Sequence, residues 1–303
     1  MRLGVVLDGP AGPALVAEAA AADRVGLDLV WVTATDRDGT RRDATVVAAA
    51  LARVVRDAAV VVEADPYHHP LELAEKLAVT DLLLGGRLTV AFVGSDAAVG
   101  RGAAAAAGPD AVPPDRVAEG VEVTLAGLSP LPFRHAGRHW TFPAAGAPDR
   151  LRVTPAPAQL AMATWAVGAD MKAVADRFGL PLVAMEDETL ASRGGSGGPG
   201  RPGRPGGPGG VRIARRRFDV PTDPGPDGTA SVAEVVAALS AERDDDGLGI
   251  CAVRLPAGGA AHRLGAVEVL GARVRPQLLL PRPDGDLVDS WSLPASVHLE
   301  DRP

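Results

Sequence analysis

Short apolar runs alternate with longer amphipathic stretches along most of the chain. The apolar runs contain few polar residues, which is typical of strands buried on both faces of a parallel sheet. The amphipathic stretches repeat their apolar residues at helical spacing. Regular alternation of the two predicts an α/β fold with a parallel sheet. The predicted strands are Leu3–Leu7, Leu29–Val32, Ala59–Val62, Leu88–Val93, Trp165–Gly168, Leu180–Met185, Val211–Asp223 and Ile250–Leu255.

Helices are expected between these strands, and a serine cap is predicted to begin the one that starts at Ser231. A closed barrel and a doubly wound sheet both fit this order. No GxGxxG motif follows the first strand, which counts against a dinucleotide-binding fold. We therefore predict a single-domain TIM (β/α)8 barrel over residues 1–303. The predicted helices are Ala14–Val25, Thr45–Arg56, Pro70–Leu84, Arg116–Leu128, Met171–Phe178, Ser231–Arg243 and Gly265–Leu279.

The stretch Tyr67–Ser95 is the best-defined unit of the pattern. Pro70 suits the first turn of a helix, where the missing N–H is tolerated, and His69 precedes it in the capping position. Glu72 and Lys76 are spaced as an i,i+4 ion pair. A Gly-Gly pair then ends the helix before the fourth strand.

The regular pattern breaks between the sixth and seventh predicted strands. Residues 194–210 are almost entirely Gly and Pro with two arginines, so they cannot bury enough apolar surface to order themselves. We predict a disordered or polyproline-like linker over 191–210. It would separate the first six βα units (1–190) from the last two (211–281), with a tail over 282–303. A separate hairpin is predicted from Phe133 to Phe142, where apolar and polar residues alternate around Ala136-Gly137.

Composition narrows the class of partner. The net charge is −7 and the pI is about 5.4, which argues against a nucleic-acid partner. The single cysteine, Cys251, fits a reducing cytoplasm. We expect no signal peptide, because MRLGVVLDG lacks a basic region followed by a long apolar one. No apolar run approaches the roughly 20 residues of a membrane span, so a soluble cytoplasmic protein without a membrane partner is predicted.

Candidate chemistry is expected at the carboxyl ends of the strands, where reactive residues of α/β barrels lie. Among these residues, Glu63 and Asp36 are the acids expected to handle protons. The full set is Asp8, Thr33–Asp36, Glu63, Asp65, Gly94, Ser95, Gly168–Asp170, Glu186 and Asp187.

Several candidates have a structural interpretation beside the functional one. Glu63 could line a cofactor pocket or form a salt bridge to a neighbouring strand. Gly94 and Ser95 could contact a ligand through their backbone, or simply form a βα turn. His68-His69 is interpreted as a helix cap and a surface imidazole, because adjacent histidines point in different directions and no third ligand stands at metal spacing. We therefore predict no metal site.

Four further features are expected to be mainly structural. Arg87 is expected to brace the turn between helix and strand, and Cys251 to be an inert core residue. His135 and His139 are expected on the surface of the hairpin, with a substrate-facing role as the alternative. The central arginine of Arg215–Arg217 could face the barrel mouth, but a solvated strand end is the favoured interpretation.

Two stretches resemble the luciferase-like monooxygenases, a family of flavin- or F420-dependent TIM-barrel enzymes that includes bacterial luciferase. The first carries His69-Pro70, Ala74-Glu75, Asp81 and Gly86-Arg87 ahead of a strand and a glycine-containing loop. The second is the excursion FRHAGRHWTF, which follows a helix at a similar distance downstream. The resemblance covers most of residues 1–190 and, more faintly, 211–281.

This resemblance implies a cofactor, reduced FMN or coenzyme F420, whose ring is held over the barrel mouth. It also implies a homodimer, or a heterodimer with a related chain, formed through the helices Thr45–Arg56 and Leu71–Leu84. The residues expected to contact the cofactor are Asp8, Glu63, Gly94, Ser95, Gly168 and Ala169.

The chain departs from the family pattern at three places. Residues 33–38 lack the histidine that often follows the second strand, and Ala91 replaces a glycine in the fourth. Val167–Asp170 offers an acid where a serine commonly helps to bind phosphate. Two functions therefore stay open: a flavin- or F420-dependent oxidoreductase acting on a small organic substrate, and a catalytically degenerate paralogue that serves as a binding or heterodimer subunit. An unrelated lyase or isomerase is disfavoured, because Lys76 and Lys172 lie in predicted helices.

Overall fold

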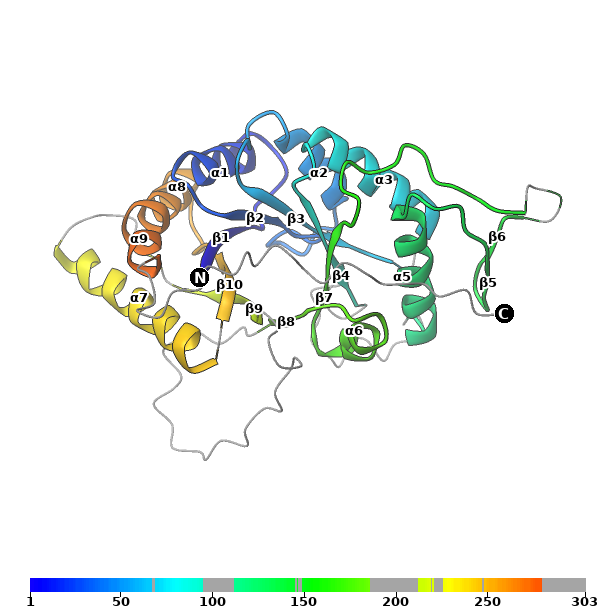
Figure 1. The fold of residues 1–303 in the computed structure, drawn as a ribbon. Helices are drawn as coiled ribbons and strands as arrows, with labels where there is room; N and C mark the ends of the chain where they lie inside the picture. Colours follow the sequence, from blue (N-terminus) through cyan, green and yellow to red (C-terminus); the bar gives the residue numbers. More distant parts are fainter. Residues whose placement is uncertain are drawn as a thin grey trace.

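A computed structural model shows the chain as a parallel barrel surrounded by helices (Figure 1). The structure describes residues 1–66, 69–94, 112–144, 146, 149–185, 212–218, 220, 226–246 and 248–279. Within this part, the strands close into a barrel in the order β1-β10-β9-β8-β7-β4-β3-β2, and every neighbouring pair is parallel. The predicted TIM barrel is confirmed.

The barrel strands fall close to the apolar runs of the sequence. They are β1 (Arg2–Leu7), β2 (Leu29–Val32), β3 (Ala59–Ala64), β4 (Leu88–Val93), β7 (Ala163–Val167), β8 (Leu182–Met185), β9 (Arg212–Arg217) and β10 (Leu248–Arg254).

Helices cover the outside of the barrel (Figure 1). No helix of the described residues is long and apolar enough to cross a membrane. The helices are α1 (Pro13–Arg24), α2 (Ala44–Leu51), α3 (Pro70–Leu83), α5 (Pro114–Leu128), α6 (Lys172–Phe178) after the 3-10 turn η1 (Ala169–Met171), α7 (Pro226–Asp246), and α8 (Ala260–Val269), which continues through a π-helical segment η3 (Leu270–Val274) into α9 (Arg275–Leu278).

Strand alternation divides the buried side chains into two cores. Side chains that point outward from the strands pack against the helices and form the larger core. Side chains that point inward fill the barrel itself, so its interior is a packed core and not a pore. The inward set includes Val6, Leu29, Trp31, Val61, Ala91, Val93, Trp165, Val167, Val183, Ile213, Ile250 and Ala252.

The unit predicted around α3 is confirmed in detail. Pro70 is the first residue of the helix, and Nδ1 of His69 accepts a hydrogen bond from the backbone N–H of Glu72 at 3.3 Å. Lys76 pairs with Glu72 at 2.7 Å. Beyond the helix, Gly85 adopts a φ of 64°, a conformation that favours glycine and stops the helix before β4.

The last third of the chain corrects two predictions. Helix α7 begins at Pro226 and not at Ser231, so the predicted serine cap is wrong. Proline suits the first helical position, since its missing N–H has no partner there in any case. Strand β9 ends at Arg217, well before the predicted Asp223. Residues 191–210 and the tail 282–303 lie outside the described residues, so the linker stays a prediction.

Glu119 of α5 holds the predicted hairpin, whose strands are β5 (His135–Ala136) and β6 (Thr141–Phe142). Its carboxylate accepts hydrogen bonds from the backbone N–H groups of Arg138 at 3.1 Å, His139 at 3.0 Å and Trp140 at 2.8 Å. Nε2 of His135 lies 3.1 Å from the same carboxylate. Burial raises the pKa of Glu119, but these hydrogen bonds together lower it by more. The net pKa is therefore below the ordinary value.

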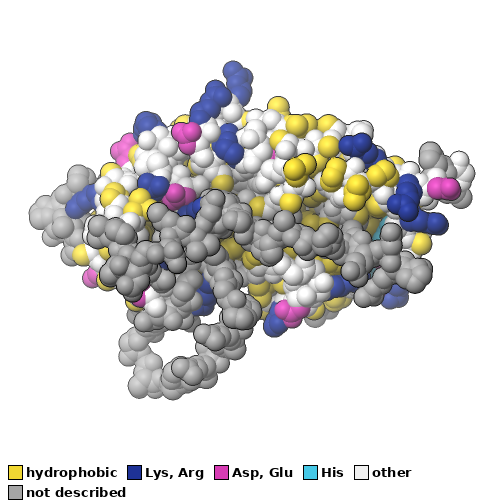
Figure 2. All heavy atoms as spheres, viewed as in Figure 1, with side chains coloured by type: hydrophobic (Ala, Val, Ile, Leu, Met, Phe, Trp, Pro, Cys, Tyr) yellow, Lys and Arg dark blue, Asp and Glu magenta, His cyan; other side chains and the backbone are white. Residues whose placement is uncertain are grey.

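Hydrophobic side chains also gather on the outer surface over α2 and α3 (Figure 2). Val46 of α2 and Val79, Leu82 and Leu83 of α3 are all exposed, Val46 by 62% and Leu83 by 56%. The two helices pack beside each other, so these side chains belong to one region of the surface. Such a gathering marks a candidate contact surface.

We expect Glu119→Gln to detach the hairpin and destabilise the protein by roughly 1–3 kcal/mol at neutral pH, because the buried carboxylate contacts are lost. The folded pKa of Glu119 is lowered, so its contribution is fully present above the ordinary value of 4.5 and is lost as the pH falls through the folded value. Thermal unfolding from pH 7 down to pH 3, about the range in which carboxylates titrate, would show the two proteins converging. Glu234→Gln, at an exposed position of α7, is the matched control. A constant difference at every pH would contradict the prediction.

Candidate functional site

A charged layer closes the carboxyl end of the barrel interior. Strand alternation turns Glu63 of β3 and Arg215 of β9 inward above the apolar layers. Trp31 and Trp165 lie in the same interior with their ring centroids 5.7 Å apart. The guanidinium of Arg215 lies 5.3 Å from the centroid of the Trp31 ring, within the range of a cation–π contact. This end of the barrel is therefore polar and aromatic.

The carboxylate of Glu63 contacts three partners inside this layer. Its carboxylate accepts hydrogen bonds from Nε1 of Trp31 at 3.1 Å and from the backbone N–H of Ala34 at 2.8 Å. It also forms an ion pair with Arg215, and the side chain is only 5% exposed. The salt bridge of Glu63 is confirmed, but the expected partner was wrong, because Arg215 lies on β9 across the barrel and not on a neighbouring strand.

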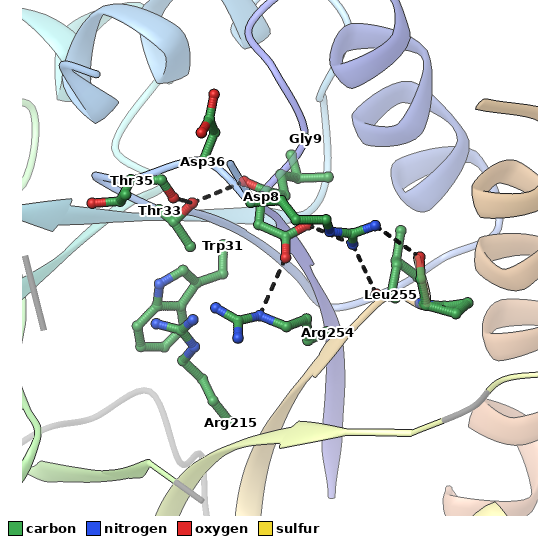
Figure 3. A network of polar contacts seen from close by, with 12 residues as sticks. Asp8, Gly9, Trp31, Thr33, Thr35, Asp36, Arg215, Arg254 and Leu255 are labelled. Atoms are coloured by element: carbon green, nitrogen blue, oxygen red, sulfur yellow. Dashed lines mark hydrogen bonds and ion pairs between the residues drawn. The ribbon is translucent and has the colours of Figure 1, made fainter. Parts of the chain in front are cut away.

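Asp8, which follows β1, lies at the centre of an arginine cluster (Figure 3). Its carboxylate lies 3.0 Å from Arg37, 3.2 Å from Arg254 and 3.1 Å from Arg263. Arg263, on α8, also binds Glu18 of α1 through two contacts of 2.6 and 2.8 Å. Burial lowers the pKa of Arg263, but the hydrogen bonds and charges of Glu18 and Asp8 outweigh it and raise the net value. The cluster ties the first and last βα units of the barrel together.

Arg42 joins the ends of β1 and β2 from the loop that follows β2. Its Nε donates to the backbone carbonyl of Thr33 at 2.8 Å, and one terminal nitrogen donates to the hydroxyl of Thr33 at 2.8 Å. The guanidinium also donates to the carbonyls of Leu7 and Gly9. Burial lowers the pKa of Arg42, and nearby carboxylates oppose this only in part. Arg42 therefore adds a further cation next to the Asp8 cluster.

Asp36 lies apart from Glu63. Its Oδ1 accepts hydrogen bonds from the backbone N–H groups of Asp38 at 3.0 Å and Thr40 at 2.8 Å, both in its own loop. In Figure 3 its side chain points away from Asp8. The structure therefore does not bring the two predicted proton-handling acids together.

The ends of β4 and β7 carry the predicted glycines. A Cβ added to Gly94 would overlap the carboxylate of Asp170, so the acid of η1 packs directly on this glycine. Gly168 adopts a φ of 94°, which favours glycine, and ends β7. Ala169 follows it on the exposed side. On this side of the mouth, Gly94 is buried beside the acid, whereas Ala169 is exposed.

The remaining predicted candidates fall into three groups. Asp65 pairs with Arg41 at the rim, and the hydroxyl of Thr33 donates to the carbonyl of Thr35 at 2.7 Å. Arg87 donates to the carbonyls of Ala58 at 2.7 Å and Val55 at 3.0 Å, which confirms its bracing role. The candidates outside the described residues are Ser95, His68, Glu186 and Asp187.

Two predictions about buried side chains have opposite outcomes. Cys251 is fully buried, and burial raises the pKa of its thiol to about 12, so the interpretation as an inert core residue is confirmed. The prediction for Arg215–Arg217 is wrong. Arg215 faces the mouth, whereas the central Arg216 points outward to Glu242 at 2.9 Å, and both are buried.

Sequence reasoning missed the arginines around Asp8. Arg254 ends the eighth strand of the barrel and carried the same signal as Glu63, a polar residue at the end of an apolar run. Arg37 directly follows the candidate range Thr33–Asp36. Arg263 gave no such signal, because it lies on a helix and reaches Asp8 through the fold.

Comparison with known proteins gives one family match. The model of the luciferase-like monooxygenase family matches residues 4–192. No curated protein matches the chain.

Solved structures of the same architecture are similar at 13–16% identity. The oxygenating constituent of 3,6-diketocamphane monooxygenase from Pseudomonas putida, a type II Baeyer–Villiger enzyme in complex with FMN, has a TM-score of 0.63 at 16% identity and covers 93% of this chain and 99% of its own. An F420-dependent secondary alcohol dehydrogenase in complex with an F420–acetone adduct has a TM-score of 0.64 at 13% identity, with 91% and 98% covered. A monooxygenase from Streptomyces bottropensis has a TM-score of 0.60 at 16% identity, with 92% and 100% covered. At these identities, the similarity to the solved structures shows that they share the fold of this chain and nothing more.

We expect Glu63→Gln to destabilise the protein by roughly 3–5 kcal/mol, because it removes the charge that compensates buried Arg215. The double variant Glu63→Leu/Arg215→Met should recover part of this loss, since apolar side chains can replace a buried pair, but Trp31 Nε1 and the Ala34 N–H lose their acceptor. Urea unfolding midpoints of the single and double variants give both values. Glu72→Gln, which breaks an exposed pair on α3, is the control and should change stability by less than about 1 kcal/mol. If Glu63→Gln cost no more than this control, the ion pair would not contribute to stability.

Proposed function

The chain belongs to the luciferase-like monooxygenase family, and we propose that it is an oxidoreductase that uses reduced FMN or coenzyme F420 to act on a small organic substrate. The main support is the charged and aromatic layer at the carboxyl end of the barrel, which is the end where α/β barrels carry out their chemistry. The interior below this layer is lined mainly by apolar side chains.

The residues of the mouth fit a cofactor that has both a planar ring and a negatively charged tail. We propose that the ring lies over the ends of β4 and β7, against the backbone of Gly94, Gly168 and Ala169, with Ser95 as a further contact. Asp8 and Glu63 would act from below by holding the arginines in place. When bound, the cofactor supplies the redox chemistry, while the protein orients it and excludes water.

Glu63 and Asp36 are the acids that we propose for proton transfer. For Glu63 to take up a proton, its contact with Arg215 would have to loosen, because the carboxylate already accepts from three groups. Asp36 would have to turn from the loop amides of Asp38 and Thr40. Both acids act as fixed charges in the present arrangement.

The existing hydrogen bonds and ion pair of Glu63 and Asp36 also support a second candidate function. In a catalytically degenerate paralogue the barrel would serve as a binding or heterodimer subunit, and its polar groups could all be engaged with one another. The packing of Asp170 on Gly94 favours this alternative, because a carboxylate there repels a phosphate. The two functions differ in whether a cofactor binds.

Titration of the purified protein with FMN, reduced FMN and F420 separates the two. The enzyme should bind one of them saturably, with a dissociation constant on the order of micromolar, and quench the fluorescence of Trp31 and Trp165 at the mouth. Adenosine monophosphate, which has a phosphate but no redox ring, is the control. If none of the three binds up to about 1 mM, the degenerate paralogue is the function that stands.

We also propose that the chain forms a homodimer through the exposed apolar side chains of α2 and α3. The family resemblance implies a dimer contact on these helices, and Val46, Val79, Leu82 and Leu83 would supply the apolar surface. Light scattering should give a mass near twice 30.9 kDa.

Leu83→Asp should convert this dimer into a monomer, because a charge would be buried at the contact. Leu131→Asp changes an equally apolar side chain that is 70% exposed elsewhere and should leave the dimer intact. A monomeric wild-type protein would rule out the homodimer, and a heterodimer with a related chain would then be sought.

A further inference from the structure

A chain of buried charges lies behind the barrel mouth, where helices α1 and α8 pack beside each other (Figure 1). Glu18 of α1 and Arg263 of α8 meet there, and their side chains are only 3% and 5% exposed. Nε and one terminal nitrogen of Arg263 bind the two carboxylate oxygens of Glu18 at 2.6 and 2.8 Å. This bidentate pair fixes the plane of the guanidinium.

The other terminal nitrogen of Arg263 reaches the end of β1. It donates to Oδ1 of Asp8 at 3.1 Å, and the side chain of Asp8 is 3% exposed. Arg37, in the loop after β2, donates to the same oxygen at 3.0 Å. Nε of Arg254 lies 3.2 Å from the second oxygen. Asp8 is therefore held from behind by a helix and from the mouth by a loop and a strand end.

Arg37 continues the chain of contacts to β10. Its terminal nitrogens donate to the carbonyls of Leu255 and Pro256 at 3.0 and 3.1 Å. Its backbone N–H donates to the carbonyl of Asp8 at 2.7 Å. Pro256 lies shortly before α8, the helix that carries Arg263. The contacts thus begin and end in the segment from β10 to α8, and they include the loops after β1 and β2.

The contact between Arg263 and Asp8 does more than compensate a buried charge. Glu18 alone already supplies a partner for Arg263, and a buried ion pair is weak evidence for stability, because apolar side chains can replace it. The additional contact restricts the carboxylate of Asp8 to one position at the end of β1. Groups that are held in place before a ligand arrives lose less entropy when it binds.

We propose that Arg263 is a positioning residue of the barrel mouth. Held by Glu18, it fixes Asp8, and Asp8 fixes Arg37, so that the loops after β1, β2 and β10 keep one arrangement before a ligand binds. For its effect on a ligand, the inference rests on the proposed function, in which Asp8 belongs to the mouth that holds the cofactor. The order of the loops themselves can be measured without cofactor.

The competing explanation is that the pair only braces α1 against α8. Arg263→Met alone would leave the carboxylate of Glu18 buried without its cation. The test variant is therefore Glu18→Leu/Arg263→Met, which removes both charges. Asp8 keeps its contacts with Arg37 and Arg254 in this variant, so the fold should survive. Arg263→Lys is the conservative variant, because it keeps the charge but lacks the planar fork that reaches both acids.

Hydrogen exchange of the cofactor-free protein over residues 33–42 gives the first readout. The backbone N–H of Arg37 should exchange faster by about tenfold or more in Glu18→Leu/Arg263→Met, because Asp8, its acceptor, is less restricted. Arg263→Lys should give a rate between those of the wild type and the double variant. Helix α3 has no part in these contacts and should exchange at the same rate in all three proteins.

Two control variants separate positioning from bracing. Val274→Ala empties space in the core at the far end of the same helical run, so it lowers stability without removing a contact of Asp8. Arg24→Gln breaks the pair with Glu268, which also joins α1 to α8 but is 64% and 58% exposed. Neither should speed exchange at Arg37 by more than about twofold. If Val274→Ala speeds it as much as the double variant at an equal loss of melting temperature, the positioning role is refuted.

Titration with FMN, reduced FMN and F420 gives the second readout. If the wild type binds one of them, Glu18→Leu/Arg263→Met should weaken that binding by about tenfold, and Val274→Ala should not. Equal affinity in the wild type and the double variant would refute the positioning role and leave the proposed function standing. If the wild type binds none of them while exchange at Arg37 still depends on Arg263, the order of the loops stands and the proposed function fails.

Discussion

Closing a parallel sheet into a barrel forces every second side chain of each strand into one small interior. That constraint governs this protein from its core to its mouth. Much of the interior is filled by aliphatic side chains, and Trp31 and Trp165 meet there in a tilted contact. At the carboxyl end the same alternation leaves Glu63 and Arg215 no direction but inward, so each must find its partner across the barrel. The charged layer is thus a consequence of closure.

Buried charges must be compensated, and compensation decides where the remaining charge can lie. Glu63 forms an ion pair with Arg215, and Glu18 forms one with Arg263. Asp8 then has further arginines around it, and those nearest the solvent meet it at the rim. Solvent at the rim weakens the repulsion between neighbouring cations, whereas deep burial would strengthen it. The cations at the rim follow from how the deeper charges pair.

The sequence predicted the strands well because a strand buried on both faces is an unbroken apolar run. It predicted α3 nearly to the residue because His69, Pro70 and Gly85 each have a local conformational reason to be there. It failed where the deciding contact is distant in the chain. Whether Arg215 or Arg216 turns inward depends on a register shared with β8 and β10, and Arg263 meets Asp8 across 255 residues. Local pattern carries no such information.

The composition of the mouth bears on whether the barrel is only a scaffold. Apolar side chains of similar volume can replace a buried ion pair without loss of stability, and this barrel already fills much of its interior in that way. A scaffold that needed stability alone would gain nothing from placing Glu63, Arg215 and Arg254 at the end where barrels bind their ligands. Fixed charges at that end do have a use in orienting an anionic or ring-bearing ligand before it binds, because they are held in position by one another and need not reorganise. Closure thus sets the direction of these side chains, and their charge supports the proposed function more directly than it supports the stability of the fold.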